Sequence, residues 1–304
     1  MFNCRRLLLS AAAIAALVGT VREAAADWRK EYPTINFAVI SGESNVDVLA
    51  RYVDFEAYLE RTLGVDANIV TATDYAGIIE ALRTKRAHAS FMGPAGYARA
   101  WLVSGGDVEA FAVMSDHSGI THYNSVMVVK ADTPAQSVED MKGKTVGYSD
   151  PNSTSGYQSP TFYLRKQGIV PDEHFGHTSF AGNHENALLG VLNGTYDATF
   201  TSIREGGRST FGRMQEKGMI PKDSVRIIWT SPNLPDDPFV MVKSLPEDMK
   251  ADIKDAMVNM AERDPKALES MSGGSAEKVL PVTHDFYVDI VEMLEENERM
   301  RRGG

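Results

Sequence analysis

Residues 144–168 read KTVGYSDPNSTSGYQSPTFYLRKQG, and the order of patterns in this stretch indicates the fold class. Residues 144–148 have the pattern of a short strand, and the polar loop 150–156 follows directly. A helix pattern then continues to Gly168, with Pro160 suited to its first turn because a helix start leaves N–H groups unpaired anyway. Strand, polar loop and helix in this order form the repeating unit of an α/β sheet.

The same order of elements occurs on both sides of this stretch. Apolar strand patterns alternate with helix patterns whose starts carry Asp or Asn caps and whose ends carry glycine. The expected strands are 35–40, 67–70, 88–92 and 197–200, and the expected helices begin near Asp47, after Asp74 and at Asn183. We therefore predict an α/β protein of two similar lobes, each with a mostly parallel sheet flanked by helices.

Two further apolar strands, 125–130 and 238–243, bracket the second region. If both cross between the lobes, the chain leaves lobe one near Ser125 and returns near Asp237. The C-terminal helices then finish on lobe one. The expected divisions are 27–125 for the first part of lobe one, 126–237 for lobe two, and 238–304 for the return to lobe one.

The first 26 residues have the layout of a secretory signal peptide. Arg5 and Arg6 precede the apolar run 7–18, which is short for a membrane span, and small residues end the segment at Ala26. We expect cleavage near Ala26 and export to the periplasm. An N-terminal membrane anchor is the alternative, and the arginine pair leaves open whether export is Sec-dependent or twin-arginine.

Composition narrows the class of protein. The chain has 304 residues, 43% of them hydrophobic, which is enough for two domains with cores of their own. With 31 basic and 41 acidic residues the net charge is -10, which argues against a nucleic-acid surface. The one cysteine, Cys4, lies in the predicted signal peptide, so the mature chain has no thiol for catalysis, disulfides or metal binding.

The most informative group of polar residues is Ser153-Thr154-Ser155-Gly156 at a helix start. Free N–H groups and the positive end of the helix dipole converge there, which favours an anion, although a plain helix cap explains the same pattern. His184 and Tyr75 also lie at predicted helix starts and could donate to the same anion. No Walker motif, nucleophile elbow or metal-ligand spacing occurs, so we expect no enzyme activity, cofactor or metal.

An ordered set of segments resembles a known family, the periplasmic phosphonate-binding proteins of ABC transporters. The resemblance runs from about Thr34 to Leu245 and includes one further segment nearer the C-terminus. The matching segments are 74–79 (DYAGII), 150–157 (DPNSTSGY), 182–185 (GNHE), 229–232 (WTSP), 235–238 (PDDP) and 281–284 (PVTH).

The resemblance implies a type II periplasmic binding fold, with two lobes joined by two crossing strands that close on a ligand in the interlobe cleft. The residues that match the family's phosphonate contacts are Ser153, Thr154, Ser155, His184, Tyr75 and Tyr123. All six are neutral donors, which can replace the hydration of an oxyanion without a fixed cation. An arginine clamp would hold the anion more tightly and slow its release.

Aminophosphonate binders of this family also place carboxylates near the ligand's amine. Asp237 matches one of these positions. The second follows the strand at Asp197, where either Arg204 or Glu205 could face the cleft. Glu205 would accommodate an amine, whereas Arg204 would favour a simple anion or a carboxylated phosphonate.

The resemblance implies a binding component of an ABC importer. Its ligand would be 2-aminoethylphosphonate, phosphite, phosphate or a related phosphorus oxyanion, and its partners the permease and ATPase of the transporter. The protein is expected to be a monomer. The alternative is a sensor or enzyme module on the same fold that acts on a different small anion.

Overall fold

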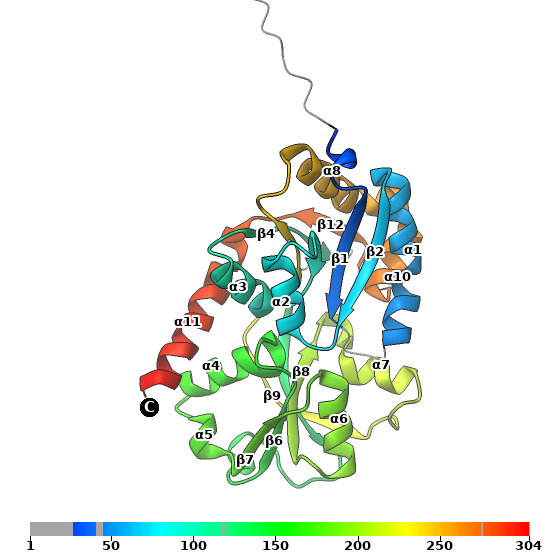
Figure 1. Ribbon diagram of the computed structural model, residues 1–304. Coiled ribbons are helices and arrows are strands. Elements are labelled where there is room, and N and C mark those ends of the chain that lie inside the picture. Colours follow the sequence, from blue (N-terminus) through cyan, green and yellow to red (C-terminus); the bar gives the residue numbers. More distant parts are fainter. Residues whose placement is uncertain (1–26, 41–44, 117, 120, 275, 304) are drawn as a thin grey trace, which may run out of the picture.

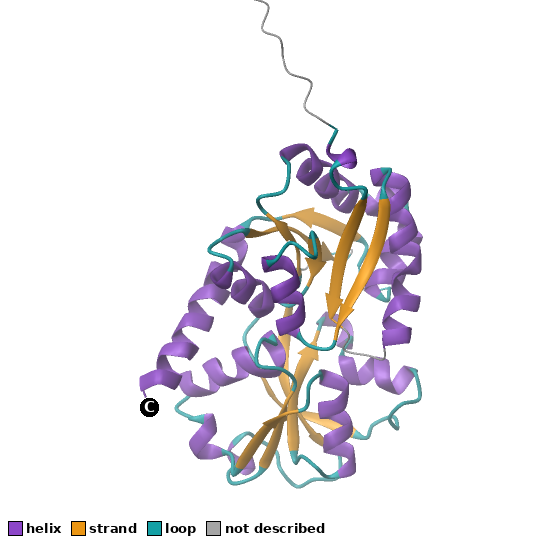
Figure 2. Ribbon diagram, in the orientation of Figure 1, coloured by secondary structure: helices purple, strands orange, loops and turns teal. Residues whose placement is uncertain are grey.

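The computed structural model describes residues 27–303 apart from 41–44, 117, 120 and 275, so the predicted signal peptide lies outside the described residues. Figure 1 shows two lobes stacked end to end, and Figure 2 shows that each has a central sheet with helices packed around it. We call the lobe that contains the first strand lobe one and the other lobe two. The predicted α/β class is confirmed.

The sheet of lobe one has six strands in the order β12-β4-β11-β3-β1-β2. β1 pairs in parallel with β2 and β3, whereas β4, β11 and β12 pair antiparallel. The strands are β1 (Thr34–Ile40), β2 (Asp66–Ala72), β3 (Ala89–Phe91), β4 (Val108–Ser115), β11 (Pro238–Val242) and β12 (Lys278–Pro281).

The sheet of lobe two has the order β10-β5-β8-β6-β7, and β9 also pairs with β5. β6 pairs in parallel with β7 and β8, whereas β5 pairs antiparallel with β8, β9 and β10. The strands are β5 (His122–Lys130), β6 (Thr145–Tyr148), β7 (His177–Phe180), β8 (Ala198–Ile203), β9 (Val225–Thr230) and β10 (Leu234–Pro235).

Helices cover both sheets. Lobe one carries α1 (Asn45–Leu63), α2 (Tyr75–Arg83), α3 (Pro94–Val103), α8 (Glu247–Val258), α9 (Met260–Arg263) and α10 (Pro265–Ser272), and the chain ends in α11 (Val288–Gly303). Lobe two carries α4 (Ser159–Lys166), α5 (Pro171–His174), α6 (His184–Asn193) and α7 (Thr210–Glu216). A π-helical turn, Thr154–Gln158, leads directly into α4.

Local signals explain where the helices begin and end. The carboxylate of Asp74 accepts a hydrogen bond from the amide of Gly77 and caps α2, and the side chain of Asn183 does the same for Asn186 in α6. α1 ends at Leu63 because Gly64 adopts a positive φ of 72°, a conformation that costs glycine little. These features are short-range, and the predicted element positions are confirmed.

The prediction of mostly parallel sheets is wrong, because both sheets are mixed. In each sheet the parallel strands are those joined by a helix, as β1 is joined to β2 by α1. Each antiparallel pair includes a strand next to a passage of the chain between the lobes, namely β4, β5, β10 or β11. A strand that enters from the other lobe needs no helical crossover and pairs in the opposite direction.

The chain leaves lobe one between Ser115 and His122, earlier than the predicted exit near Ser125. All of β5, which contains Ser125, belongs to the sheet of lobe two. The chain returns between Pro235, the end of β10, and Pro238, the start of β11. Asp236 and Asp237 therefore form the second passage between the lobes.

α11 contacts both lobes rather than lobe one alone. It packs against α3 of lobe one and α4 of lobe two, and Figure 1 shows it along the side of the molecule. An apolar cluster that includes Ala98, Phe162 and Leu294 fills this junction. The side-chain amide of the buried Asn297 donates to the backbone oxygen of Gln158 at 2.9 Å, which ties α11 to the π-helical turn. The C-terminal helix is thus a third connection between the lobes.

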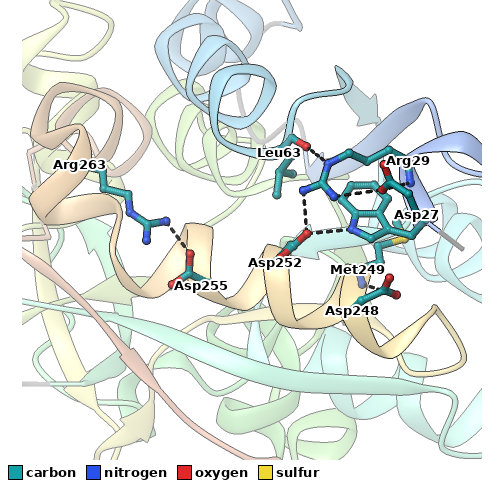
Figure 3. Close-up of polar contacts among 9 residues, drawn as sticks. Asp27, Arg29, Leu63, Asp248, Met249, Asp252, Asp255 and Arg263 are labelled. Atoms are coloured by element: carbon teal, nitrogen blue, oxygen red, sulfur yellow. Dashed lines mark hydrogen bonds and ion pairs between the residues drawn. The ribbon is translucent and has the colours of Figure 1, made fainter. Parts of the chain in front are cut away.

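The first described residues are fixed to lobe one (Figure 3). The indole of Trp28, only 2% exposed, donates to Asp252 of α8 at 2.8 Å. The guanidinium of Arg29 donates to the same carboxylate and, at 2.7 Å, to the carbonyl oxygen of Leu63. Trp28 and Arg29, at the start of the described residues, are therefore packed onto lobe one. Among the helices of the described chain, none is long and apolar enough to cross a membrane.

Candidate functional site

A cavity of about 190 Å³ lies between the lobes. Its wall is formed by the carboxyl ends of strands and the amino ends of helices from both lobes, together with Asp237 from the second passage. The lining residues of lobe one are Ile40, Arg51, Tyr52, Tyr75, Phe91, Met92 and Gly93, and those of lobe two are Tyr123, Ser149, Ser153, Thr154, Ser155, Gly182, Asn183, His184, Ser202, Arg204, Thr210 and Arg213.

The π-helical turn presents the three predicted hydroxyl groups to this cavity. The hydroxyl of Ser153 accepts a hydrogen bond from the amide of Gly156 at 3.1 Å and so caps the turn. The carbonyl oxygen of Ser155 accepts a 2.6 Å hydrogen bond from the hydroxyl of Ser125 in β5. The turn is therefore held at both its start and its middle, and its side chains have defined positions.

Gly156 is required in this turn because its backbone packs closely against the end of β6. A Cβ atom at this position would lie 1.7 Å from the hydroxyl oxygen of Ser149 and 2.9 Å from the ring of His184. Contacts this short do not occur between real atoms, so a larger residue would displace the turn.

His184, the first residue of α6, reaches the same turn. Its Nε2 lies 3.1 Å from the hydroxyl oxygen of Ser153. Burial, reinforced by the positive charge of Arg213, lowers the pKa of His184 to about 4. The ring is therefore neutral at neutral pH and offers a single N–H donor rather than a fixed positive charge.

Tyr75 and Tyr123 approach from opposite sides of the cavity. Tyr75 begins α2 and lies beside Ser153, whereas Tyr123 lies in β5 beside Thr154. Burial and the negative charge of Asp237 raise the pKa of both phenols above the usual range. Both hydroxyls therefore remain protonated and able to donate.

A direct hydrogen bond joins the lobes beside these tyrosines. The hydroxyl oxygen of Thr154 accepts from the amide of Ala95 at 2.8 Å. Ala95 is the second residue of α3, so its N–H is one of those that a helix start leaves without a backbone partner. The structure therefore has the two lobes in contact across the cleft.

The structure places Arg204 and Glu205 in different surroundings. Arg204 lines the cavity, whereas Glu205 is exposed and borders a different hollow. Glu205, one of the predicted ligand-binding residues, therefore lies outside this cavity. β8 ends at Ile203 and the chain turns there, so neighbouring side chains point in different directions.

Arg204 is paired with both aspartates of the second passage. Its guanidinium contacts Asp236 through two nitrogens and lies 3.6 Å from a carboxylate oxygen of Asp237. Burial opposes the charged form of Arg204, but the two carboxylates outweigh it and raise its pKa. Burial also raises the pKa of Asp237 to about 6, against the opposing charge of Arg204. Asp237 reaches the cavity as predicted, but as the partner of an arginine.

Arg51 and Arg213 are cavity residues that sequence reasoning missed. Arg51 lies on α1 of lobe one and Arg213 on α7 of lobe two, and both line the cavity. The six residues predicted to contact the ligand are neutral, but arginines also line the cavity. Each arginine is a single polar residue on a helix. The local sequence pattern does not distinguish an arginine that lines a cavity from an arginine that faces solvent. Among the described residues, no three His, Cys, Asp or Glu side chains gather as metal ligands would.

Most of the chain matches one known protein family. The model of the family described as the periplasmic substrate-binding protein of ABC phosphonate transporters matches residues 37–287. The chain belongs to this family. The strands and helices that line the cavity fall within the matched range.

Curated members of the phosphonate-binding family match a large part of the chain. The phosphonates-binding periplasmic protein of Escherichia coli (strain K12) is 31% identical over 229 residues, which are 74% of this chain and 65% of that protein. The phosphate-import protein PhnD of Mycolicibacterium smegmatis is 32% identical over 200 residues, which are 64% of this chain and 60% of that protein. The matches thus span somewhat less than two thirds of these relatives.

Solved structures agree with the type II binding fold. The binding protein component of an ABC phosphonate transporter from Pseudomonas aeruginosa has a TM-score of 0.75 and 28% identity, with 86% of this chain and 85% of that chain covered. PhnD1 of Prochlorococcus marinus (MIT 9301), solved with methylphosphonate, has a TM-score of 0.76 and 19% identity, with 88% and 98% covered. At 19% identity, the similarity to PhnD1 shows a shared fold and nothing more.

Proposed function

We propose that this protein is the extracytoplasmic solute-binding component of an ABC importer and binds a phosphonate or related phosphorus oxyanion between its lobes. The observation that carries the proposal is the ring of hydroxyl donors around the interlobe cavity. Ser153 and Tyr123 belong to lobe two and Tyr75 to lobe one, so a bound oxyanion is contacted from both sides. Membership of the phosphonate-binding family supports the same function.

The chemistry of these donors suits a tetrahedral oxyanion. An oxyanion with three or more oxygens needs several donors in different directions, and hydroxyls on a turn, a strand and a helix start supply them. The raised pKa of each phenol keeps its proton in place, and neutral His184 adds one N–H. The cavity is large enough for a small molecule and too small for a peptide.

Binding is proposed to act through closure of the lobes, with no covalent bond made or broken. A ligand that contacts both lobes favours the closed arrangement by its difference in affinity for the two states. The bond from Ala95 to Thr154 forms only when the lobes are together. The closed form would then deliver its ligand to the permease and ATPase of the transporter as a monomer.

We further propose that residues 1–26 are a signal peptide cleaved near Ala26, which places the mature protein in the periplasm. The family consists of periplasmic proteins, and the packed residues Trp28 and Arg29 lie directly after the proposed site. The competing idea, an uncleaved anchor, predicts that the N-terminal residue of the purified protein is Met1 rather than Asp27. Sequencing the N-terminus of the exported protein decides between them.

Calorimetric titration of the purified protein tests the function. The panel is methylphosphonate, 2-aminoethylphosphonate, phosphite, phosphate and ethanolamine, an amine without phosphorus. We expect heat only with the phosphorus oxyanions, and loss of binding when Ser153→Ala is combined with Thr154→Ala. Ser224→Ala, which removes an exposed hydroxyl of lobe two remote from the cavity, is the matched control.

Two results would count against this function. No heat with any phosphorus compound, from a sample that unfolds cooperatively, would refute a phosphonate receptor. Chemical change of a bound phosphonate ester, followed by phosphorus NMR, would instead favour an enzyme on the same fold.

A further inference from the structure

The π-helical turn Thr154–Gln158 carries hydroxyl groups of the proposed ligand site, and groups outside the turn hold two of its carbonyl oxygens. The carbonyl oxygen of Ser155 accepts from the hydroxyl of Ser125 in β5 at 2.6 Å. The carbonyl oxygen of Gln158 accepts from the side-chain amide of Asn297 in α11 at 2.9 Å. Single π-helical turns are rare and often lie at functional sites. The C-terminal helix thus contacts the backbone of a turn that lines the cavity.

Asn297 contacts Gln158 at two points through its side-chain amide. The amide nitrogen lies 2.9 Å from the backbone oxygen of Gln158 and 2.9 Å from its side-chain oxygen Oε1. The side-chain nitrogen of Gln158 in turn donates to the carbonyl oxygen of Pro151 at 2.5 Å. Because backbone carbonyls only accept hydrogen bonds, each of the two side-chain amides has one possible orientation. Gln158 therefore closes the segment 151–158, and Asn297 holds Gln158 in the position that closes it.

Asn297 is a polar residue on the buried face of α11. It is 3% exposed, and Ile290, Met293 and Leu294 of the same helix are also buried but apolar. The side-chain oxygen of Asn297 has no hydrogen-bond partner among the described residues, and a buried acceptor without a partner lowers stability. An apolar side chain would avoid that cost but would leave two oxygens of Gln158 without their donor. The amide at this position therefore has a specific role toward the turn.

The same part of α11 is attached to lobe one. α11 packs against α3, and Glu298, the neighbour of Asn297, forms an ion pair with Arg99 of α3. The amino end of α3 is also the element whose Ala95 donates to Thr154 across the cleft. Adjacent residues of one helix therefore contact the turn of lobe two and a helix of lobe one.

We infer that Asn297 is a positioning residue of the ligand site: through Gln158 it holds the segment 151–158, so that Ser153 and Thr154 present their hydroxyl groups to the cavity. The inference rests on the proposed function and deepens it. Asn297 is not one of the described residues that line the cavity, so it acts through the turn and not on the ligand. Donors that are ordered before binding spare the complex the free-energy cost of ordering them.

Calorimetric titration with methylphosphonate tests this inference. We expect Asn297→Leu to bind at least about tenfold more weakly than the unsubstituted protein, because two buried hydrogen bonds to Gln158 are lost. Ile290→Ala is the matched control, since it removes a buried side chain from the same helix and leaves Asn297 in place. Ile290→Ala should lower the free energy of unfolding, measured with urea, and leave the affinity unchanged.

Gln158→Met is a second variant, of similar length and without the side-chain amide. It removes the bond to Pro151 and one of the two acceptors of Asn297, so it should also weaken binding. In this background Asn297→Leu should cost less affinity than it does alone, because the two residues act on the turn together.

Hydrogen exchange followed by NMR gives a readout that needs no ligand. The amides of Gln158 and Ser159 donate within the turn, to the carbonyl oxygens of Ser153 and Thr154. In Asn297→Leu both amides should exchange faster relative to the amides of β5, whereas Ile290→Ala should not change this ratio.

The outcomes separate the inference from the proposed function. If methylphosphonate binds the unsubstituted protein and Asn297→Leu equally well, or if Asn297→Leu and Ile290→Ala lose affinity equally, the inference is refuted and the receptor function stands. If Asn297→Leu does not fold, unchanged affinity in Gln158→Met refutes the inference. If the unsubstituted protein binds none of the phosphorus oxyanions, the proposed function has failed and the inference fails with it.

Discussion

The hydroxyl oxygen of Thr154 accepts a hydrogen bond from the backbone amide of Ala95 at 2.8 Å, and this bond crosses from lobe two to lobe one. Both groups are buried. Thr154 therefore has two possible partners in its proposed role, the ligand and the amino end of α3. In that role Thr154 would couple the π-helical turn, which we call the oxyanion turn, to closure of the cleft.

Replacing Thr154 by valine should weaken binding by roughly tenfold or more. Valine keeps the shape but leaves the buried N–H of Ala95 without an acceptor, which costs about 1–3 kcal/mol in the closed state. Calorimetry with methylphosphonate measures the affinity, and small-angle scattering of the ligand-bound protein measures compactness. Thr84→Val, at an exposed helix end, is the control. Unchanged affinity would show that this bond does not stabilise closure.

Gly156→Ala should abolish binding and lower the free energy of unfolding, because the new methyl group overlaps the hydroxyl oxygen of Ser149. Removing the obstructing side chain should restore part of the loss, so we expect the double variant with Ser149→Gly to be more stable than Gly156→Ala alone. Urea unfolding measures the free energy of unfolding of the single and the double variant. If the double variant is the less stable of the two, close packing between these residues is not the cause.

His184 should stay neutral to about pH 4. Its folded pKa of about 4 lies below the unfolded value of about 6.5, so the unfolded chain binds more protons between these values. The free energy of unfolding therefore has its full value, as far as His184 is concerned, above pH 6.5. It falls by about 3 kcal/mol as the pH is lowered towards 4. NMR titration of the ring measures its pKa directly.

The same residue offers a test of the contribution of Arg213. In Arg213→Gln the pKa of His184 should rise, because the like charge that disfavours the imidazolium has been removed. Burial is the larger cause, so the pKa should remain below 6.5. A His184 pKa that does not move would place Arg213 farther from the ring than the structure has it.

Arg204→Met should destabilise the protein by about 3 kcal/mol, because it leaves Asp236 and Asp237 partly buried without their cation. Adding Asp236→Asn to this variant should recover part of the loss. Arg208→Met, at an exposed neighbour, should change stability far less. Equal losses from Arg204→Met and Arg208→Met in urea unfolding would contradict a structural role for the ion pair.

The oxyanion turn could be predicted from the sequence because its parts are adjacent. Residues 153–156 supply the cap, the hydroxyls and the glycine within four positions, and helix caps act over a single turn. The starts of α2 and α6 were predictable for the same reason. The family resemblance implied that the turn and these two helix starts meet at one cavity, and residues of all three line the cavity in the structure.

The arginines of the cavity could not be predicted this way. Arg51 and Arg213 lie on helices far apart in the chain, and only the packing of those helices brings them to one wall. The choice of Arg204 over Glu205 depends on a single residue of register at the end of β8, where one step turns a side chain to another face.

The α/β class, the family and the hydroxyl-bearing turn at residues 153–156 could be predicted from the sequence alone, because periodicity, caps and contiguous motifs are short-range properties of the chain. The mixed sheets, the bridging position of α11 and the arginines that line the cavity became visible only in the tertiary structure. These depend on contacts between residues tens to hundreds of positions apart. No local pattern encodes which of several polar side chains will face a shared cleft.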